Sequence, residues 1–227
     1  MNSGWSQTAF FFGYGCELTF DTDNEGNLVK MNASYASDAG VAAVKAMINL
    51  VKSPAFVNGS SFSTATNVGA IVDGTWDSAS AKEAFGDNYA AVKLPTVDGV
   101  QLGGFGGFKM LGVKPQTDDD KLAACDALAA YLTSGDVQLA RYNAVGWGPS
   151  NLAAQQDPAV QAEEALSALG AQLAFTQPQG QYPGEYWNLA TGLGDDIIAG
   201  KYNDADDATL LEVLQGFEAT CESYLTK

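Results

Sequence analysis

Apolar and polar residues alternate near the beginning of the chain, and apolar residues then recur at the spacing of a helix. CELTF and NLVKM alternate, with the polar stretch DTDNEGN between them, so residues 17–31 are predicted to form a β-hairpin. Apolar residues then recur at helical spacing over residues 37–52, behind a Ser37/Asp38 cap. This pattern predicts an amphipathic helix.

Three short apolar runs further along are predicted as strands. They are residues 67–74, 89–95 and 108–114. A glycine-rich bend at 97–107 separates the last two. Residues 75–86 are predicted as a helix that is capped by Thr75 or Asp77.

The second half of the chain is predicted to be mainly helical. The expected helices cover residues 117–134, 135–144, 158–175, 184–200 and 206–225. Acidic residues in the first turn of the 117–134 segment suit the positive end of a helix dipole. The pattern indicates an α/β fold with a small sheet, without internal repeats or a low-complexity linker.

Composition and charge narrow the classes of function. The 227 residues are 46% hydrophobic and 17% charged, which is an ordinary globular composition. The net charge of -16 repels phosphate backbones and anionic lipids, so we expect no nucleic-acid partner and no membrane-surface binding. The chain has no histidine, which excludes most imidazole acid–base chemistry, the usual catalytic triads and histidine-containing zinc sites.

Neither the spacing of the cysteines nor the first residues identify the cellular compartment of the protein. Cys16, Cys125 and Cys221 are scattered, without a CxxC pair, and an odd count leaves at least one thiol unpaired within the chain. No apolar run approaches transmembrane length, and the first 15 residues lack the basic and apolar regions of a signal peptide. The expectation is either a cytoplasmic protein or a targeting segment that is absent from this chain.

The stretch DTDNEGNLVKMN has the letters of a calcium-binding loop. Asp21, Asp23 and Glu25 alternate, and Gly26 follows where an EF-hand loop turns sharply. An EF-hand also needs a glutamate at the twelfth position and flanking helices, but this position is Asn32 and the flanks alternate like strands. The stretch is therefore interpreted as a polar hairpin turn, and no metal site is predicted.

Aromatic residues near two predicted helix starts are the candidates for binding. Trp76 comes just after a predicted buried strand, at the edge where ligands lie in open α/β sheets. Tyr182, Tyr186 and Trp187 surround the beginning of another helix. An indole face can stack on the C–H face of a sugar ring while nearby carboxylates accept its hydroxyl hydrogen bonds. The alternative is that these aromatics are core residues.

A resemblance to a known family runs through these stretches. Its segments, in order, are GVAAVKAMINLV, VGAIVDGTW, YAAVKLPTVDG, GGFGGFKMLGVKP, KLAACDALAAYLTSGDVQLARYNAVGWGPSN and EYWNLATGLGDDIIAGK. In them the chain resembles the C-terminal part of an extracellular solute-binding protein of ABC importers, of the maltose/maltodextrin and oligosaccharide-binding group. The resemblance implies that Trp76 and Trp187 stack on sugar, with Trp5 a weaker candidate ahead of Phe10 and Phe11. Where the maltodextrin binders have a basic residue, one helical turn after the second tryptophan, this chain has Thr191. The resemblance therefore does not imply that the chain binds the same sugar.

The set of ligand-binding candidates joins these aromatics to nearby acids. It consists of Trp76, Trp187, Tyr186, Asp73, Glu185 and Trp5.

The resemblance also implies a domain organisation. The fold would be of the periplasmic-binding-protein type II, as the C-terminal lobe plus a strand and two helices of the other lobe. Residues 1–105 and 150–227 would form the C-terminal lobe, and residues 109–146 would belong to the N-terminal lobe. The stretches 103–107 and 146–151 would be hinge crossings, because glycine supplies the dihedral freedom that a hinge needs.

Family members are longer, so we expect a fragment of a two-lobed protein. Its exposed or swapped elements could pair with a second copy as a homodimer.

Three functions remain open from the sequence. The first is the carbohydrate-binding component of an ABC importer, which delivers an oligosaccharide to membrane permease subunits without chemistry or cofactor. Such a protein would be periplasmic or a cell-surface lipoprotein, and half a cleft would bind sugar weakly or not at all. The second is a glycoside-processing enzyme that uses two acids among Asp73, Glu185 and Asp195. The third is a purely structural or interaction domain.

Overall fold

The computed structural model describes residues 1, 3–59 and 68–225 of the chain. Its contacts divide the chain into two compact units. The first unit consists of Met1–Val72, Leu94–Gly107 and Gln172–Lys227, and the second of Asp73–Lys93 and Phe108–Ala171. The assignment of residues 1–105 and 150–227 to one lobe and 109–146 to the other stays a prediction.

The first unit contains four long helices and several short strands. Its helices are α1 (Gly4–Gly13), α2 (Asp38–Lys52), α8 (Gly184–Ile198) and α9 (Asp207–Glu222), with the 3-10 turn η4 (Leu173–Phe175). Its strands are β1 (Leu18–Thr22), β2 (Leu28–Ala33), β3 (Thr96–Val97), β4 (Val100–Gln101), β5 (Gly104–Gly106) and β6 (Thr176–Pro178). β1 with β2 and β3 with β4 are antiparallel pairs, whereas β5 and β6 are parallel.

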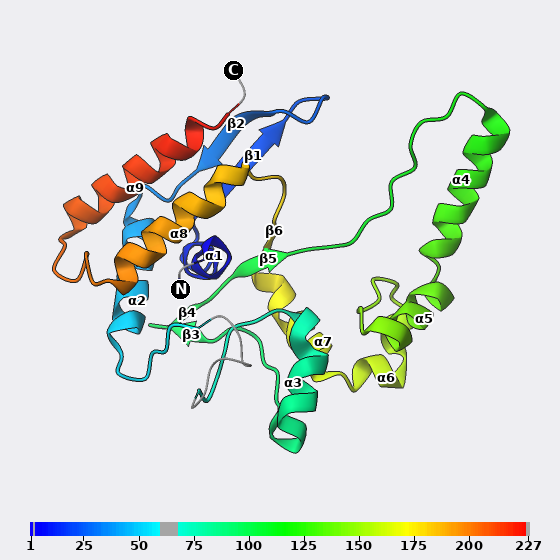
Figure 1. Ribbon diagram of the computed structural model, residues 1–227, viewed down its shortest axis with the longest axis horizontal. Helices are drawn as coiled ribbons and strands as arrows, with labels where there is room; N and C mark the ends of the chain where they lie inside the picture. Colours follow the sequence, from blue (N-terminus) through cyan, green and yellow to red (C-terminus); the bar gives the residue numbers. More distant parts are fainter. Residues whose placement is uncertain (2, 60–67, 226–227) are drawn as a thin grey trace. The chain divides into compact units, whose positions relative to one another are not determined.

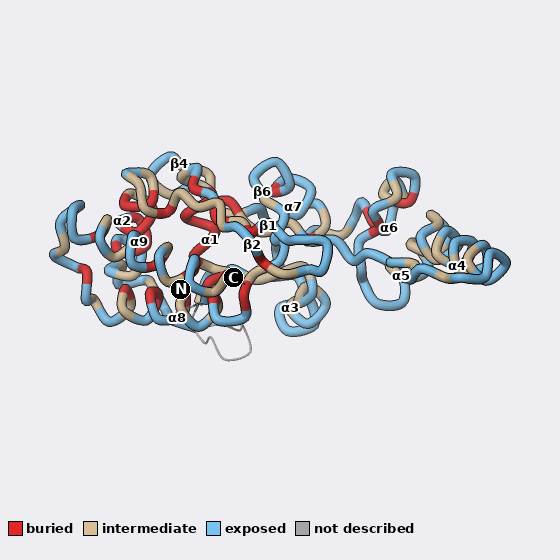
Figure 2. The backbone as a smooth tube through the Cα atoms, turned by 90° about the horizontal axis from the view of Figure 1, so that it is seen from above, coloured by how far each residue is buried: buried red, intermediate tan, exposed pale blue. Residues whose placement is uncertain are grey.

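The apolar core of this unit is built around α1. Figure 1 shows α1 end-on, and it contacts α2, α8 and β5. The rings of Phe11 on α1 and Tyr35 stack at 3.8 Å, and both side chains are buried. Buried residues are concentrated in these elements in Figure 2. The run AFFF of α1 was not predicted as a helix, because all of its residues are buried and no polar face gives it a helical period.

The predicted hairpin is confirmed. Leu18 pairs with Ala33 and Phe20 with Met31 across β1 and β2. In the turn, the carboxylate of Asp23 accepts hydrogen bonds from the backbone amides of Glu25 and Asn27, at 2.8 and 2.9 Å. The side-chain amide of Asn27 also donates to Asp23 Oδ2, at 2.9 Å, and this bond, together with the backbone bonds, lowers the pKa of the Asp23 carboxyl group. Its oxygens are therefore engaged in holding the turn.

Apart from the one at 158–175, the predicted helices are confirmed, and some of them begin at a side-chain cap. The Ser37 hydroxyl accepts from the amide of Gly40 at 3.2 Å, so α2 starts at the predicted cap. Asp77 lies at the N-cap of α3 (Ser78–Phe85), behind a 3-10 turn that carries Thr75. The expected helix at 158–175 is divided into α6 (Pro158–Gln161), α7 (Glu164–Gln172) and the 3-10 turn η4, which belongs to the first unit.

The second unit is helical. It contains α3 (Ser78–Phe85), α4 (Asp119–Leu132), α5 (Gly135–Val145), α6 (Pro158–Gln161) and α7 (Glu164–Gln172), with 3-10 turns η1 (Thr75–Asp77), η2 (Gly86–Asn88) and η3 (Ala154–Gln156). Every residue of α4 and α5 is at least partly exposed.

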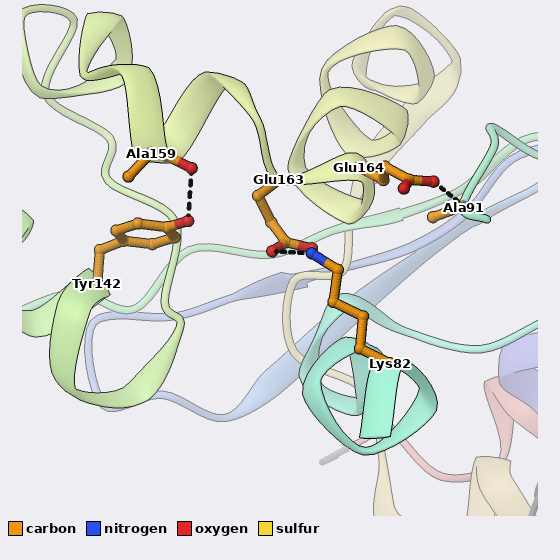
Figure 3. A network of polar contacts seen from close by, with 6 residues as sticks. All are labelled: Lys82, Ala91, Tyr142, Ala159, Glu163 and Glu164. Carbon is orange, nitrogen blue, oxygen red and sulfur yellow. Dashed lines mark hydrogen bonds and ion pairs between the residues drawn. The ribbon is translucent and has the colours of Figure 1, made fainter. Parts of the chain in front are cut away.

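A polar network links α3 to the start of α7, as Figure 3 shows. Lys82 Nζ donates to Glu163 Oε2 at 2.9 Å, which raises the pKa of the lysine. The backbone amide of Ala91 donates to Glu164 Oε2 at 3.3 Å. These contacts join the segment behind Trp76 to the later helices of the same unit.

The three predicted strands are wrong. Residues 68–74, 89–95 and 108–114, all in the described part of the chain, form no strand, while Asn67 lies outside it. Several of their apolar side chains are exposed, such as Val92 (84%) and Met110 (88%). A strand is stable only when a neighbouring strand completes its hydrogen bonds, and an apolar run cannot encode whether such a neighbour exists.

Candidate functional site

Trp76 is a solvent-exposed aromatic platform in the second unit. It occupies the middle of η1, immediately before α3, and is 69% exposed. Gly74, two residues earlier, lies under the six-membered ring of the indole: a Cβ built on Gly74 would overlap three of its atoms. One face of the ring is thus covered by backbone.

Two carboxyl groups lie close to this platform. The backbone amide of Gly74 donates to Asp73 Oδ1 at 2.7 Å. Burial, together with the neighbouring charge of Asp77, raises the pKa of the Asp73 carboxyl group. Two acids that can accept hydrogen bonds therefore lie close to an exposed indole, as binding of a polyol on an aromatic platform requires.

Trp187 is the corresponding aromatic of the first unit, and it lies in a cluster of rings. It is in the first turn of α8 and is partly buried. Its ring centroid lies 5.0 Å from that of Tyr186, 5.7 Å from that of Tyr182 and 6.4 Å from that of Phe105. The Tyr182 hydroxyl donates to the backbone carbonyl of Leu18, which fixes the cluster to β1. Trp187 is therefore rigidly held and only part of its surface is open.

The other candidates of the first unit differ in exposure. Tyr186 is 1% exposed, so its ring supports Trp187 from inside the core instead of facing a ligand, and burial raises the pKa of its hydroxyl. Glu185 is exposed in the same turn of α8. Phe10 and Phe11 are buried in the core, so neither ring is open to a ligand.

The helix that carries Trp5, α1, begins against α8. A Cβ built on Gly4 would lie 2.8 Å from the Cβ of Ala190 and 3.3 Å from Cε3 of Trp187. Trp5 is the next residue of α1 and is partly buried. The first turn of α1 and the first turns of α8 therefore lie close together in the first unit.

The six candidates fall in different units. Trp76 and Asp73 belong to the second unit, and the other four belong to the first. Each group is described within its own unit, so the expectation that both indoles contact one saccharide stays a prediction.

Trp147 is an exposed aromatic that was not among the sequence candidates. It is 46% exposed, and Lys109 Nζ lies 4.0 Å from its ring centroid in a cation–π contact within the second unit. The sequence did contain a signal, since this indole lies in the glycine-rich stretch at 146–151. One of its faces is already covered by the lysine.

The described residues support neither a metal site nor a reactive cysteine. Within residues 1, 3–59 and 68–225, no group of three or more Cys, Asp or Glu side chains could hold a metal ion. Burial raises the pKa of the Cys16 thiol to about 11 and that of Cys221 to about 12, so neither is a ready nucleophile. A shallow pocket of about 270 Å³ in the first unit, between Phe12 and Gln177, contains none of the six candidates.

Comparisons with known proteins agree on one family. A family model described as bacterial extracellular solute-binding protein matches residues 1–168, well over half of the chain. The galactooligosaccharide-binding protein of Bacillus subtilis (strain 168) is 29% identical over 135 residues, which are 58% of this chain and 31% of that protein.

Solved structures show the same fold. A maltodextrin-binding protein from L. casei BL23 without ligand has a TM-score of 0.74 at 20% identity, and the match covers 97% of this chain and 60% of that one. A structure with acarbose has a TM-score of 0.70 at 25% identity, over 98% of this chain and 60% of that one. A maltose-maltodextrin binding protein of Alicyclobacillus acidocaldarius has a TM-score of 0.64 at 24% identity, over 93% and 58%. The predicted fold class is confirmed, and the chain spans about 60% of these structures and 31% of the curated relative.

Proposed function

Because the chain belongs to the bacterial extracellular solute-binding protein family, we propose that it forms a large part of the carbohydrate-binding component of an ABC importer. In this proposal an oligosaccharide binds without chemistry or cofactor and is handed to membrane permease subunits. The observation that carries the proposal is the exposed indole of Trp76, which lies against Gly74 with Asp73 close by. The names of the similar proteins, which refer to galactooligosaccharide and maltodextrin, support a carbohydrate ligand.

In the proposed binding mode, tryptophan rings stack on the sugar and acidic side chains form hydrogen bonds with it. Trp76 and Trp187 would each cover the C–H face of a pyranose ring, with Trp5 beside the second indole. Asp73 and Glu185 would accept hydrogen bonds from sugar hydroxyl groups. Tyr186 would act indirectly, because its buried ring holds Trp187 in place.

A binding role is favoured over glycoside processing by the chemistry of the acids. A glycosidase places its two carboxyl groups about 5 Å or more apart, so that the scissile bond fits between them. Asp73 does have a raised pKa, caused by burial and by the neighbouring charge of Asp77. The partner acids of this alternative, Glu185 and Asp195, belong to the first unit, so the second unit does not itself contain the candidate pair.

The location that we propose is outside the cytoplasm, in the periplasm or as a cell-surface lipoprotein. The family is described as extracellular, which supports this location. Within the described residues, no helix has the length and apolar character that crossing a bilayer requires. We also propose that exposed apolar side chains such as Val92 and Met110 allow the chain to pair as a homodimer. Light scattering on the purified chain would measure this, and a monomer at all concentrations would contradict it.

The binding proposal can be tested from the indole N–H signals of the four tryptophans. Neutral oligosaccharides of glucose and of galactose are titrated into 15N-labelled protein up to the millimolar range. We expect the Trp76 and Trp187 signals to shift and that of Trp147 to stay in place, because Lys109 covers its ring. If neither Trp76 nor Trp187 responds to any saccharide, the proposed site is wrong.

Affinity is expected to be low. Family members bind sugar as two lobes close, and this chain spans about 60% of the similar structures. Calorimetry with maltooligosaccharides measures it, and micromolar or tighter binding would contradict the expectation.

A further inference from the structure

We propose that Gly74 is a positioning residue for the saccharide platform: its missing side chain lets the Trp76 indole lie face-on against the backbone, which fixes the plane on which a pyranose ring stacks. This inference rests on the proposed function and deepens it by naming what sets the orientation of the ring. The ligand class is a neutral pyranose with one apolar C–H face, since that is the shape that a single fixed aromatic plane recognises.

Gly74 lies against the face of the Trp76 ring. A Cβ on Gly74 would be equally distant, to within 0.1 Å, from Cη2, Cζ2 and Cζ3 of Trp76. Points equidistant from three atoms of a six-membered ring lie on the axis through the ring centre. The Cα of Gly74 therefore points at the face of the indole and not at its edge, and the added methyl group would overlap the ring.

The backbone does not require glycine at this position. Gly74 has φ -100° and ψ 165°, an extended conformation that any residue adopts. Gly26 and Gly146, in contrast, have φ of 86° and 71°, where a side chain strains the backbone. For Gly74 the three atoms nearest to an added side chain all belong to the indole, so the indole and not the backbone conformation is what excludes it.

Two hydrogen bonds hold the backbone around the glycine. The amide of Gly74 donates to Asp73 Oδ1 at 2.7 Å, and its carbonyl accepts from the amide of Asp77 at 3.2 Å. A side chain at Gly74 must displace either this turn or the indole. The indole is 69% exposed, so it can rotate at lower cost than two backbone hydrogen bonds can break. Substitution should therefore move the platform while the fold survives.

The test compares Gly74→Ala with Gly112→Ala, a matched control in the same unit. At Gly112 the described chain places no atom within 4 Å of an added Cβ, and φ is not in the left-handed region. In the free protein, Gly74→Ala should displace the Trp76 indole N–H signal and Gly112→Ala should not. The melting temperature of both variants should remain close to that of the unchanged chain. A Trp76 signal of Gly74→Ala at its original position would overturn the proposal.

Binding to a glucose or galactose oligosaccharide supplies the second readout. We expect Gly74→Ala to weaken binding by about fivefold or more, because the stacking plane is lost. In a Trp76→Ala background the same substitution should have no further effect, since it acts through the ring. Equal losses in both backgrounds would overturn the positioning role and leave the proposed function intact. If Trp76→Ala itself binds like the unchanged chain, the proposed function of Trp76 fails instead.

Discussion

Replacing the two candidate tryptophans should separate binding from stability. A tryptophan side chain has ~250 Å² of surface. With 69% of the residue exposed, about 170 Å² of Trp76 faces solvent. A pyranose ring that covers about half of this area removes ~85 Å² from water, which is worth ~2 kcal/mol at ~25 cal/mol per Å². Trp76→Ala should therefore weaken saccharide binding by about thirtyfold.

The stability effects of the two substitutions should differ. Trp76 is mostly exposed, so Trp76→Ala should change the free energy of unfolding by less than ~0.5 kcal/mol. Trp187 packs among three other aromatic rings, so Trp187→Ala should lose about 2 kcal/mol in addition to its loss of binding. Trp147→Ala is the control for removing an exposed indole whose face is already occupied.

Two measurements on each variant check this reasoning. Titration of the remaining indole N–H signals with oligosaccharide gives the dissociation constant, and urea unfolding gives the stability. If Trp76→Ala unfolds much more easily than the unchanged chain, its ring is part of the core and the area estimate is invalid. If Trp147→Ala weakens binding as much as Trp76→Ala does, an exposed indole alone is not a sufficient criterion for the site.

Further predictions concern thiols, pH and packing. Cys16 and Cys221 have raised thiol pKa values, so an alkylating agent at pH 8 should label Cys125 first and all three only after unfolding, as mass spectrometry would count. A raised pKa makes ionised Asp73 unfavourable for the fold, so Asp73→Asn should raise the melting temperature at pH 7. The gain should disappear below the ordinary pKa of 3.8, and a gain that persists there would contradict its electrostatic origin. A Cβ on Gly40 would overlap a backbone carbonyl oxygen, so Gly40→Ala should cost ~3 kcal/mol or more in urea unfolding; a loss below ~1 kcal/mol would contradict the close approach.

Features encoded by neighbouring residues could be predicted from the sequence. The hairpin turn is closed by the side chain of Asp23 and by Gly26 at φ 86°, all within one short segment. The start of α2 is likewise encoded by Ser37, which caps an amide three residues away. Local hydrogen bonds of this kind do not depend on the rest of the fold.

Features that depend on distant partners could not be predicted in the same way. The runs at 89–95 and 108–114 have the apolar residues of strands, but a strand also needs a neighbour. Tyr186 and Trp187 are adjacent and equally aromatic in the sequence. The packing of α8 against its neighbours, α1, α2 and Phe217 of α9, decides that the first is buried and the second partly open.

The charges around the candidate indoles predict which sugars the chain prefers. Asp73 and Asp77 lie beside Trp76, Glu185 adjoins Trp187, and the chain as a whole carries a net charge of -16. Thr191, one turn after the second indole, is neutral and donates its hydroxyl to the carbonyl of Trp187 at 2.8 Å. An anionic sugar would be repelled by these acids, so a uronic-acid oligosaccharide should bind more weakly than its neutral counterpart at low salt, and the difference should shrink as salt is added. Equal affinities at low salt would mean that the saccharide does not bind beside these acids.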